Sequence, residues 1–177
     1  MRTIVVLLVA ALLPLPGQTP VTKGNALQLR KQSDREIVLE RKFTGSLQAV
    51  FDSLTQPTHL AHWMVPANMS LISCEVDLRT HGRFRYVFQR GRGAVIEVRG
   101  QYEMVDPPRF LAYLETYGFS PLQVTVATTL EQVGNETWFK QTLQYPSQQE
   151  RDTDFEGVAT SAAELYGNLE RYLGSRR

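Results

Sequence analysis

The sequence has only one cysteine and almost no net charge. One cysteine, Cys74, cannot form an internal disulfide, and alone it cannot build the thiolate-rich sites that hold structural zinc or iron–sulfur clusters. The 177 residues include 19 basic and 18 acidic side chains, whereas a surface that follows a nucleic-acid backbone needs a basic excess. We therefore expect neither a disulfide scaffold nor a nucleic-acid-binding protein.

Long hydrophobic runs are also missing. The apolar run at residues 4–13 covers about ten positions, and a helix needs roughly 20 apolar residues to cross a bilayer. Proline, glycine and charged residues are too few for an intrinsically disordered chain. With 42% hydrophobic residues, the chain has enough apolar side chains for one packed core. Its length suits a single domain.

The N-terminus has the pattern of a secretory signal peptide. Arg2 precedes the apolar run, and Pro14, Pro16 and Gly17 follow it. We predict a signal peptide at residues 1–18, a flexible polar lead at residues 19–35 and one domain at residues 36–174. No A-x-A cleavage motif is present, so an uncleaved leader that tethers the protein to a membrane is the alternative. Either way we expect an exported protein, periplasmic or secreted, that meets a membrane only through this segment.

The domain is predicted to begin with one strand and two short helices. Residues 36–43 alternate partly and are rich in residues that favour strands. Apolar side chains from Leu47 to Leu54 share one face of a short helix, and Ser46 can cap that helix. A second short helix is expected at residues 57–63, because proline is favoured in a first turn.

Six further strands are predicted at residues 70–78, 83–89, 94–105, 109–116, 122–133 and 136–143. Turns rich in glycine, proline and asparagine link them, which is typical of an antiparallel meander with one buried face. Simple alternation places Ile72 with Cys74, and Tyr102 with Met104, on the buried face. On the opposite face we expect cross-strand charge pairs between Glu75, Asp77, Glu97 and Glu103 and the arginines Arg79, Arg83, Arg85 and Arg99.

The last segment changes to a helical period. Apolar residues from Phe155 to Leu173 follow one another at intervals of three and four, which predicts a long amphipathic helix over residues 148–173. Ser147 can cap its start, and Gly174 is expected to end it. The order of strand, two short helices, six strands and a long helix predicts an α+β fold.

Several phrases of the sequence, taken in order, resemble one superfamily. They are THLAHW at 58–63, CEVDLR at 74–79 with GRFRY at 82–86, VDPPRFL at 105–111, the strand at 124–131, and LERYL at 169–173. The chain resembles the helix-grip proteins of the START and birch-pollen-allergen superfamily (SRPBCC). More narrowly, it is similar to bacterial proteins related to the activator of the heat-shock protein 90 ATPase.

The resemblance implies a helix-grip fold, in which a curved antiparallel sheet of about six to seven strands wraps around the long C-terminal helix. It also implies a cavity between sheet and helix that holds an apolar or amphipathic small molecule. No shared catalytic residue or cofactor follows from it, because members range from lipid carriers to cyclases and cochaperones.

Aromatic residues are the candidate ligand-binding residues. They would form the cavity wall, and ordinary core packing is the alternative for each: Trp63, Phe84, Tyr86, Tyr102, Tyr113, Phe139, Phe155 and Tyr166. Ala162 joins them because relatives commonly have a tryptophan near this position, so its small side chain would enlarge the cavity.

Residues able to carry catalysis or bind a metal are sparse. His59 and His62 lie on one helical face without a zinc motif around them, so we expect a solvated surface and no metal site. Cys74 is expected to be a buried, inert thiol. We assign no catalytic residue, and the candidates for an inward acid or base are Tyr86, Tyr102 and Glu97.

These patterns favour an exported binding protein for a hydrophobic or amphipathic small molecule, with no assigned protein partner and no cofactor. Two alternatives stay open. One is an enzyme on the same scaffold, such as a cyclase or a hydrolase. The other is an interaction module like the activators of the chaperone ATPase, whose cytosolic partner would be absent outside the membrane.

Overall fold

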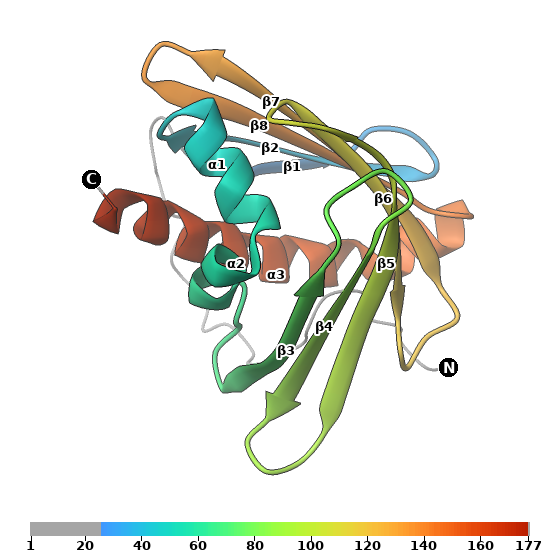
Figure 1. Cartoon of the computed structure of the whole chain (residues 1–177). Coiled ribbons are helices and arrows are strands. Elements are labelled where there is room, and N and C mark those ends of the chain that lie inside the picture. Colours follow the sequence, from blue (N-terminus) through green and yellow to red (C-terminus); the bar gives the residue numbers. More distant parts are fainter. Residues whose placement is uncertain (1–25, 177) are drawn as a thin grey trace, which may run out of the picture.

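The computed structural model describes residues 26–176, and Figure 1 shows the chain coloured along its sequence. The expected signal peptide at 1–18 and the start of the expected lead, 19–25, lie outside the described residues. Among the helices that are described, none has the length and apolarity to cross a membrane.

Three helices and one eight-stranded sheet make up the described part of the chain. All neighbouring strands pair antiparallel, in the order β1-β2-β8-β7-β6-β5-β4-β3. The elements are β1 (Gln28–Lys31), β2 (Glu36–Thr44), α1 (Leu47–Thr55), α2 (Pro57–Trp63), β3 (Met69–Val76), β4 (Arg83–Arg90), β5 (Val95–Asp106), β6 (Phe110–Tyr117), β7 (Gln123–Val133), β8 (Glu136–Gln144) and α3 (Gln148–Ser175).

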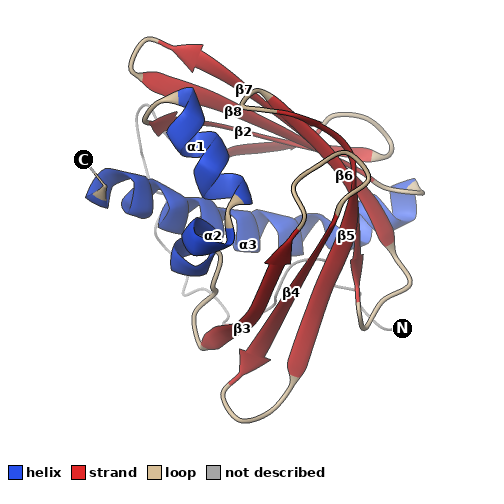
Figure 2. Ribbon diagram, in the orientation of Figure 1, coloured by secondary structure: helices blue, strands red, loops and turns tan. Residues whose placement is uncertain are grey.

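The sheet is bent, and the helices lie between its two halves. In Figure 2, strands β3–β5 diverge from β2, β7 and β8, while α3 runs across the inner side with α1 and α2 next to it. Buried side chains from the sheet and from all three helices form a single hydrophobic core. The α+β prediction is confirmed, and the arrangement is consistent with a helix grip.

The expected number of strands, six to seven, was too low because β1 was missed. This strand lies within residues 19–35, which were expected to be a flexible lead. It pairs with β2 from Gln28↔Glu40 to Lys31↔Ile37, and Lys31 Nζ lies 2.5 Å from Asp152 Oδ1 of α3. The strand was missed because the segment has a polar composition. The hydrogen bonds that pair it with β2 are made by backbone groups, which are present whatever the side chains are.

The residues predicted to start the two short helices have the expected roles. The Ser46 hydroxyl accepts a hydrogen bond from Ala49 N at 3.2 Å, and Pro57 is the first residue of α2. The Trp63 indole donates to the carbonyl of Ser53 at 2.8 Å. In a continuing helix this carbonyl would bind the N–H of residue 57, but proline has none. Trp63 therefore ties α2 to the end of α1.

Two β-bulges correct the predicted orientation of two side chains. The register shifts between Leu71 and Ser73 and again between Tyr102 and Met104. An extra residue in one strand turns the side chains beyond it to the other face. Ile72 and Met104 are therefore 55% and 54% exposed rather than buried, whereas Cys74 and Tyr102 keep their inner positions.

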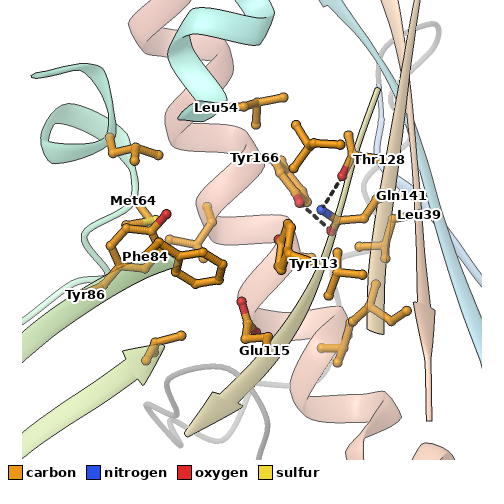
Figure 3. Close-up of a pocket in the computed structure, with 18 of the residues that line it drawn as sticks. Leu39, Leu54, Met64, Phe84, Tyr86, Tyr113, Glu115, Thr128, Gln141 and Tyr166 are labelled. Atoms are coloured by element: carbon orange, nitrogen blue, oxygen red, sulfur yellow. Dashed lines mark hydrogen bonds between the residues drawn. The ribbon is translucent and has the colours of Figure 1, made fainter. Parts of the chain in front are cut away.

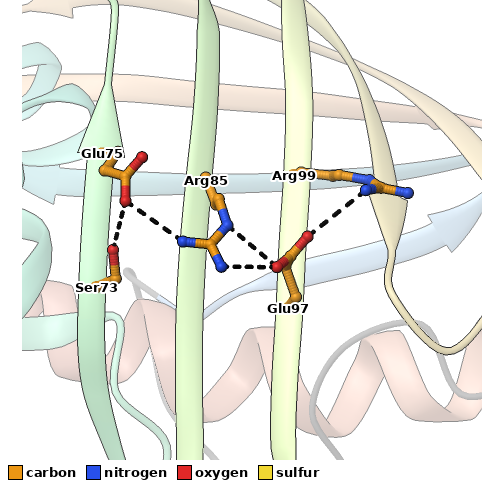
Figure 4. Close-up of polar contacts among 5 residues, drawn as sticks. All are labelled: Ser73, Glu75, Arg85, Glu97 and Arg99. Atoms are coloured by element: carbon orange, nitrogen blue, oxygen red, sulfur yellow. Dashed lines mark hydrogen bonds and ion pairs between the residues drawn. The ribbon is translucent and has the colours of Figure 1, made fainter.

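The outer face of the sheet carries two of the expected cross-strand charge pairs and a further ion pair within β5, shown in Figure 4. Arg85 contacts Glu97 at 2.9 Å on β5 and Glu75 at 3.4 Å on β3. Arg99 lies 3.6 Å from Glu97. Glu97, one of the candidates for an inward acid or base, therefore belongs to the outer face and cannot act in a cavity on the inner side.

Candidate functional site

A cavity of about 130 Å³ lies between the inner face of the sheet and the three helices, as Figure 3 shows. The three helices, together with Met64 just after α2, supply Leu54, Leu60, Trp63, Met64, Val158, Ala162, Leu165 and Tyr166. The sheet supplies Leu39, Phe84, Tyr86, Phe88, Val98, Tyr102, Leu111, Tyr113, Glu115, Tyr117, Val126, Thr128, Gln141 and Leu143. The wall is mostly apolar and aromatic, with a few polar groups set into it.

Seven of the nine candidate residues lie in this wall. They are Trp63, Phe84, Tyr86, Tyr102, Tyr113, Ala162 and Tyr166.

Phe139 and Phe155 are outside the cavity wall, which corrects their assignment. Phe139 is fully buried, and its ring centroid lies 5.6 Å from that of Phe43 and 4.8 Å from that of Tyr166. Phe155 lies beneath Lys31, whose Nζ is 4.9 Å from the ring centroid. Alternation and helical spacing identify an inner face, but they do not distinguish residues that line a cavity from those packed beside it.

Phe84 is the centre of the aromatic wall on the β4–β6 side. Its ring stacks on Tyr86 at 5.0 Å between centroids, and its centroid lies 5.4 Å from that of Tyr102 and 5.1 Å from that of Tyr113. Gly100, the partner of Phe84 in the β4–β5 ladder, makes room for this ring. A Cβ atom there would lie 2.4 Å from Phe84 Cζ.

A chain of hydrogen bonds crosses the opposite wall. The Tyr166 hydroxyl donates to Gln141 Oε1 at 2.7 Å, and Gln141 Nε2 donates to Thr128 Oγ1 at 3.1 Å. Figure 3 shows these two bonds beside the cavity. They hold three polar side chains in fixed positions within apolar surroundings, where an unpaired polar group would be costly.

Glu115 is the ionisable residue of the cavity that the sequence analysis missed. It lies on β6 between Tyr113 and Tyr117, and all three side chains line the cavity. The Tyr117 hydroxyl donates a hydrogen bond to Glu115 Oε1. Burial raises the pKa of Glu115 to about 7, although the hydrogen bond from Tyr117 acts in the opposite direction. The cavity thus contains a carboxyl group that changes its charge near neutral pH.

The tyrosine hydroxyls of the cavity are neutral donors. Burial raises the pKa of Tyr102 to about 12 and that of Tyr86 and Tyr113 well above the ordinary tyrosine value. These groups can donate a hydrogen bond to a ligand, but they cannot serve as bases near neutral pH.

The other reactive side chains, Cys74, His59 and His62, are not among the residues that line the cavity. Burial raises the pKa of the Cys74 thiol, which disfavours the thiolate that a nucleophile needs. His59 Nδ1 lies 2.7 Å from the Tyr172 hydroxyl, and His62 stacks on the same tyrosine. Within residues 26–176, His, Cys, Asp and Glu form no group of three placed to hold a metal ion.

Comparison with known proteins gives a family and a fold. The family model described as "Activator of Hsp90 ATPase homolog 1-like protein" matches residues 45–174. None of the curated proteins matches the chain.

Solved structures of bacterial proteins share the fold. A crystal structure from Rhodobacter sphaeroides has a TM-score of 0.82 at 22% identity, covering 85% of this chain and 99% of its own. One from Nitrosomonas europaea has a TM-score of 0.75 at 21% identity, covering 84% of this chain and 99% of its own. One from Mycobacterium smegmatis has a TM-score of 0.71 at 18% identity, covering 82% of this chain and 95% of its own.

Proposed function

Because the chain belongs to the Activator of Hsp90 ATPase homolog 1-like family, we propose that it uses its helix-grip cavity to bind a small hydrophobic or amphipathic molecule. The observation that carries this proposal is the cavity itself, lined mainly by apolar and aromatic side chains with a few fixed polar groups. This combination is typical of small-molecule sites, in which apolar walls give affinity and isolated polar groups give orientation.

The size of the cavity limits the ligand. Its volume of about 130 Å³ is close to the ~150 Å³ of an apolar cavity that accepts benzene. A void of this size left empty destabilises a protein by about 3 kcal/mol, at roughly 24 cal/mol per Å³. These values favour an occupant with a single ring or a short aliphatic chain.

Filling the cavity from α3 tests the proposal. Ala162 is buried in the wall, whereas its neighbour Ala163 is exposed. We expect Ala162→Leu to abolish the binding of toluene, measured by NMR titration, and Ala163→Leu to leave binding unchanged. The proposal is contradicted if the wild type binds neither toluene nor an amphipathic ligand with the same ring, or if both variants bind toluene equally well.

Catalysis on the same scaffold is the second candidate, and Glu115 is the observation that favours it. A carboxyl group with a pKa of about 7 is suited to general acid–base chemistry near neutral pH. A one-ring ketone such as cyclohexanone, incubated with the protein in D₂O, would report proton transfer as deuterium exchange next to the carbonyl. Exchange that Glu115→Gln abolishes would support this candidate, and exchange at the background rate would contradict it.

We also propose that the protein is exported, on the basis of its first 18 residues. The basic start, the short apolar run and the proline–glycine stretch are the features of a signal peptide. Expression of the full chain with a C-terminal tag in a bacterium, followed by fractionation and N-terminal sequencing, tests this. Recovery only from the cytoplasm with Met1 or Arg2 still at the N-terminus would contradict export.

A further inference from the structure

Only one of the two carboxyl oxygens of Glu115 accepts a hydrogen bond from the described residues. Its Oε1 accepts the hydrogen bond from Tyr117, and the other carboxyl oxygen has no hydrogen-bond partner among residues 26–176. In Figure 3 the carboxyl group points into the space beside Phe84 and Tyr113. The side chain is partly buried, and this oxygen has no protein donor, so it is a site for a donor from a ligand.

No positive charge accompanies this carboxyl group. The residues that line the cavity include no lysine, arginine or histidine. Gly100 and Val124, the ladder partners of Glu115 on β5 and β7, are uncharged. The titratable groups that interact with Glu115 are either neutral hydroxyls or a second acid: Tyr86, Tyr113, Tyr117, Tyr145, Tyr166 and Asp154.

Aromatic rings surround the same space. Phe84, Tyr86, Tyr102 and Tyr113 form one wall, with centroid separations of 5.0 to 6.0 Å between contacting rings. The faces of such rings carry partial negative charge and attract a cation that lies within about 6 Å of the centroid. The rings and the carboxylate therefore favour the same ligand charge.

We propose that the ligand of this cavity is a small hydrophobic amine in its protonated form, with its ammonium group bound by Glu115 and its apolar body packed against the aromatic wall. This inference rests on the proposed function and adds the chemical class of the ligand. The ammonium group supplies both the missing hydrogen-bond donor and the missing positive charge.

Ligands of other charge fit less well. A carboxylate ligand would place a second negative charge beside Glu115 in a low-dielectric cavity, where two like charges repel strongly. A neutral hydrocarbon leaves the free carboxyl oxygen unpaired. An alcohol can pair with it but gains no ionic attraction.

Three probes with the same ring separate these classes. We would measure the dissociation constants of benzylamine, benzyl alcohol and benzoate at pH 8 by NMR titration of the full chain. Benzylamine should bind about tenfold to a hundredfold more tightly than benzyl alcohol, the range of one hydrogen bond to a charged group. Benzoate should bind most weakly.

Two variants and a change of pH assign the effect to Glu115. Glu115→Gln keeps the shape of the side chain and should abolish the preference for benzylamine over benzyl alcohol. Glu103→Gln, at an exposed position on β5, should keep that preference and leave the dissociation constants of both ligands unchanged. Lowering the pH from 8 to 6 should weaken benzylamine binding about tenfold, because a group with a pKa of about 7 becomes mostly protonated.

The outcomes distinguish the two proposals. If toluene binds but benzylamine is no better than benzyl alcohol, or if Glu115→Gln keeps the preference for the amine, the ligand class is wrong and the binding function stands. If neither toluene nor benzylamine binds the wild type, both proposals are wrong.

Discussion

The hydroxyl of Tyr117 donates a hydrogen bond to the carboxyl group of Glu115, two residues earlier on the same face of β6. This is the only hydrogen bond to the Glu115 carboxyl within residues 26–176. It stabilises the ionised form, whereas burial favours the protonated form and is the larger effect. The pair makes the charge of the cavity sensitive to pH near neutrality.

The stability of the protein should depend on pH through Glu115. The pKa of this group is raised from 4.5 in the ordinary state to about 7 in the fold, so between these values the folded state binds more protons than the unfolded state. Its stabilising contribution is present below pH 4.5 and is lost as the pH rises through about 7.

Glu115→Gln should therefore equal the wild type in free energy of unfolding near pH 4.5 and exceed it above pH 7, by up to roughly 3 kcal/mol. Urea denaturation across this range measures the difference. A difference that is constant with pH would contradict the raised pKa.

Removing the hydroxyl of Tyr117 should raise the pKa of Glu115 further. Tyr117→Phe keeps the ring and deletes the one hydrogen bond that favours the carboxylate. An NMR titration that follows the Glu115 carboxyl carbon should give a midpoint above that of the wild type. A lower midpoint would mean that the hydroxyl destabilises the charged form.

Replacing Trp63 should loosen the junction of α1 and α2. Trp63→Phe removes the donor to the carbonyl of Ser53, a bond of 2.8 Å at a side chain that is 5% exposed. The unpaired carbonyl alone should lower the free energy of unfolding by about 1–3 kcal/mol. Chemical denaturation gives the value, and a loss well below this range would show that water replaces the indole.

A side chain at position 100 should displace Phe84 from its place in the cavity wall. The added Cβ of Gly100→Ala would lie 2.4 Å from both Phe84 Cζ and the carbonyl of Leu114. Such overpacking typically destabilises by about 1–3 kcal/mol, and toluene binding should weaken with it.

Gly174→Ala is the matched control for this variant. No atom lies within 4 Å of a Cβ built at this position near the end of α3. Alanine is the better helix former, so a small increase in stability is expected. Equal destabilisation by both variants would contradict the steric explanation at Gly100.

The charged outer face should be irrelevant to ligand binding. Glu97→Gln removes the partner of Arg85 and Arg99 on the side of the sheet opposite the cavity. We expect unchanged dissociation constants for toluene and benzylamine, and a small effect on stability that salt reduces further. A marked loss of ligand binding would contradict the placement of Glu97 outside the site.

Sequence patterns were sufficient at the helix starts, whereas Gly174, which was expected to end the last helix, lies within α3. Ser46, Pro57 and Ser147 act at the helix starts as expected, because capping depends on residues within one turn. The alternation of charged residues on β4 and β5 identified the outer face correctly, since the period of a strand is two. Seven of the 22 residues that line the cavity were among the candidates named from the sequence.

Glu115 was missed because no inner and outer positions were assigned to the strand expected at 109–116. Its sequence position has the same parity as Leu111, Tyr113 and Tyr117, which all line the cavity. The alternation of inner and outer positions along this strand would therefore have pointed to Glu115. An acidic residue in phase with buried aromatics is the pattern that would have identified this site.

The amino-acid sequence by itself determined the α+β class, the helix starts and most inner positions, because these follow from propensity and periodicity within each element. The tertiary structure decided which inner residues border a void and which, like Phe139, pack against one another. It also decided where the bulges reverse the strand faces at Ile72 and Met104. Both depend on how distant strands and α3 approach in space. The low charge and the single cysteine excluded whole classes of protein, and the fold then placed one acid, Glu115, where no positive charge balances it.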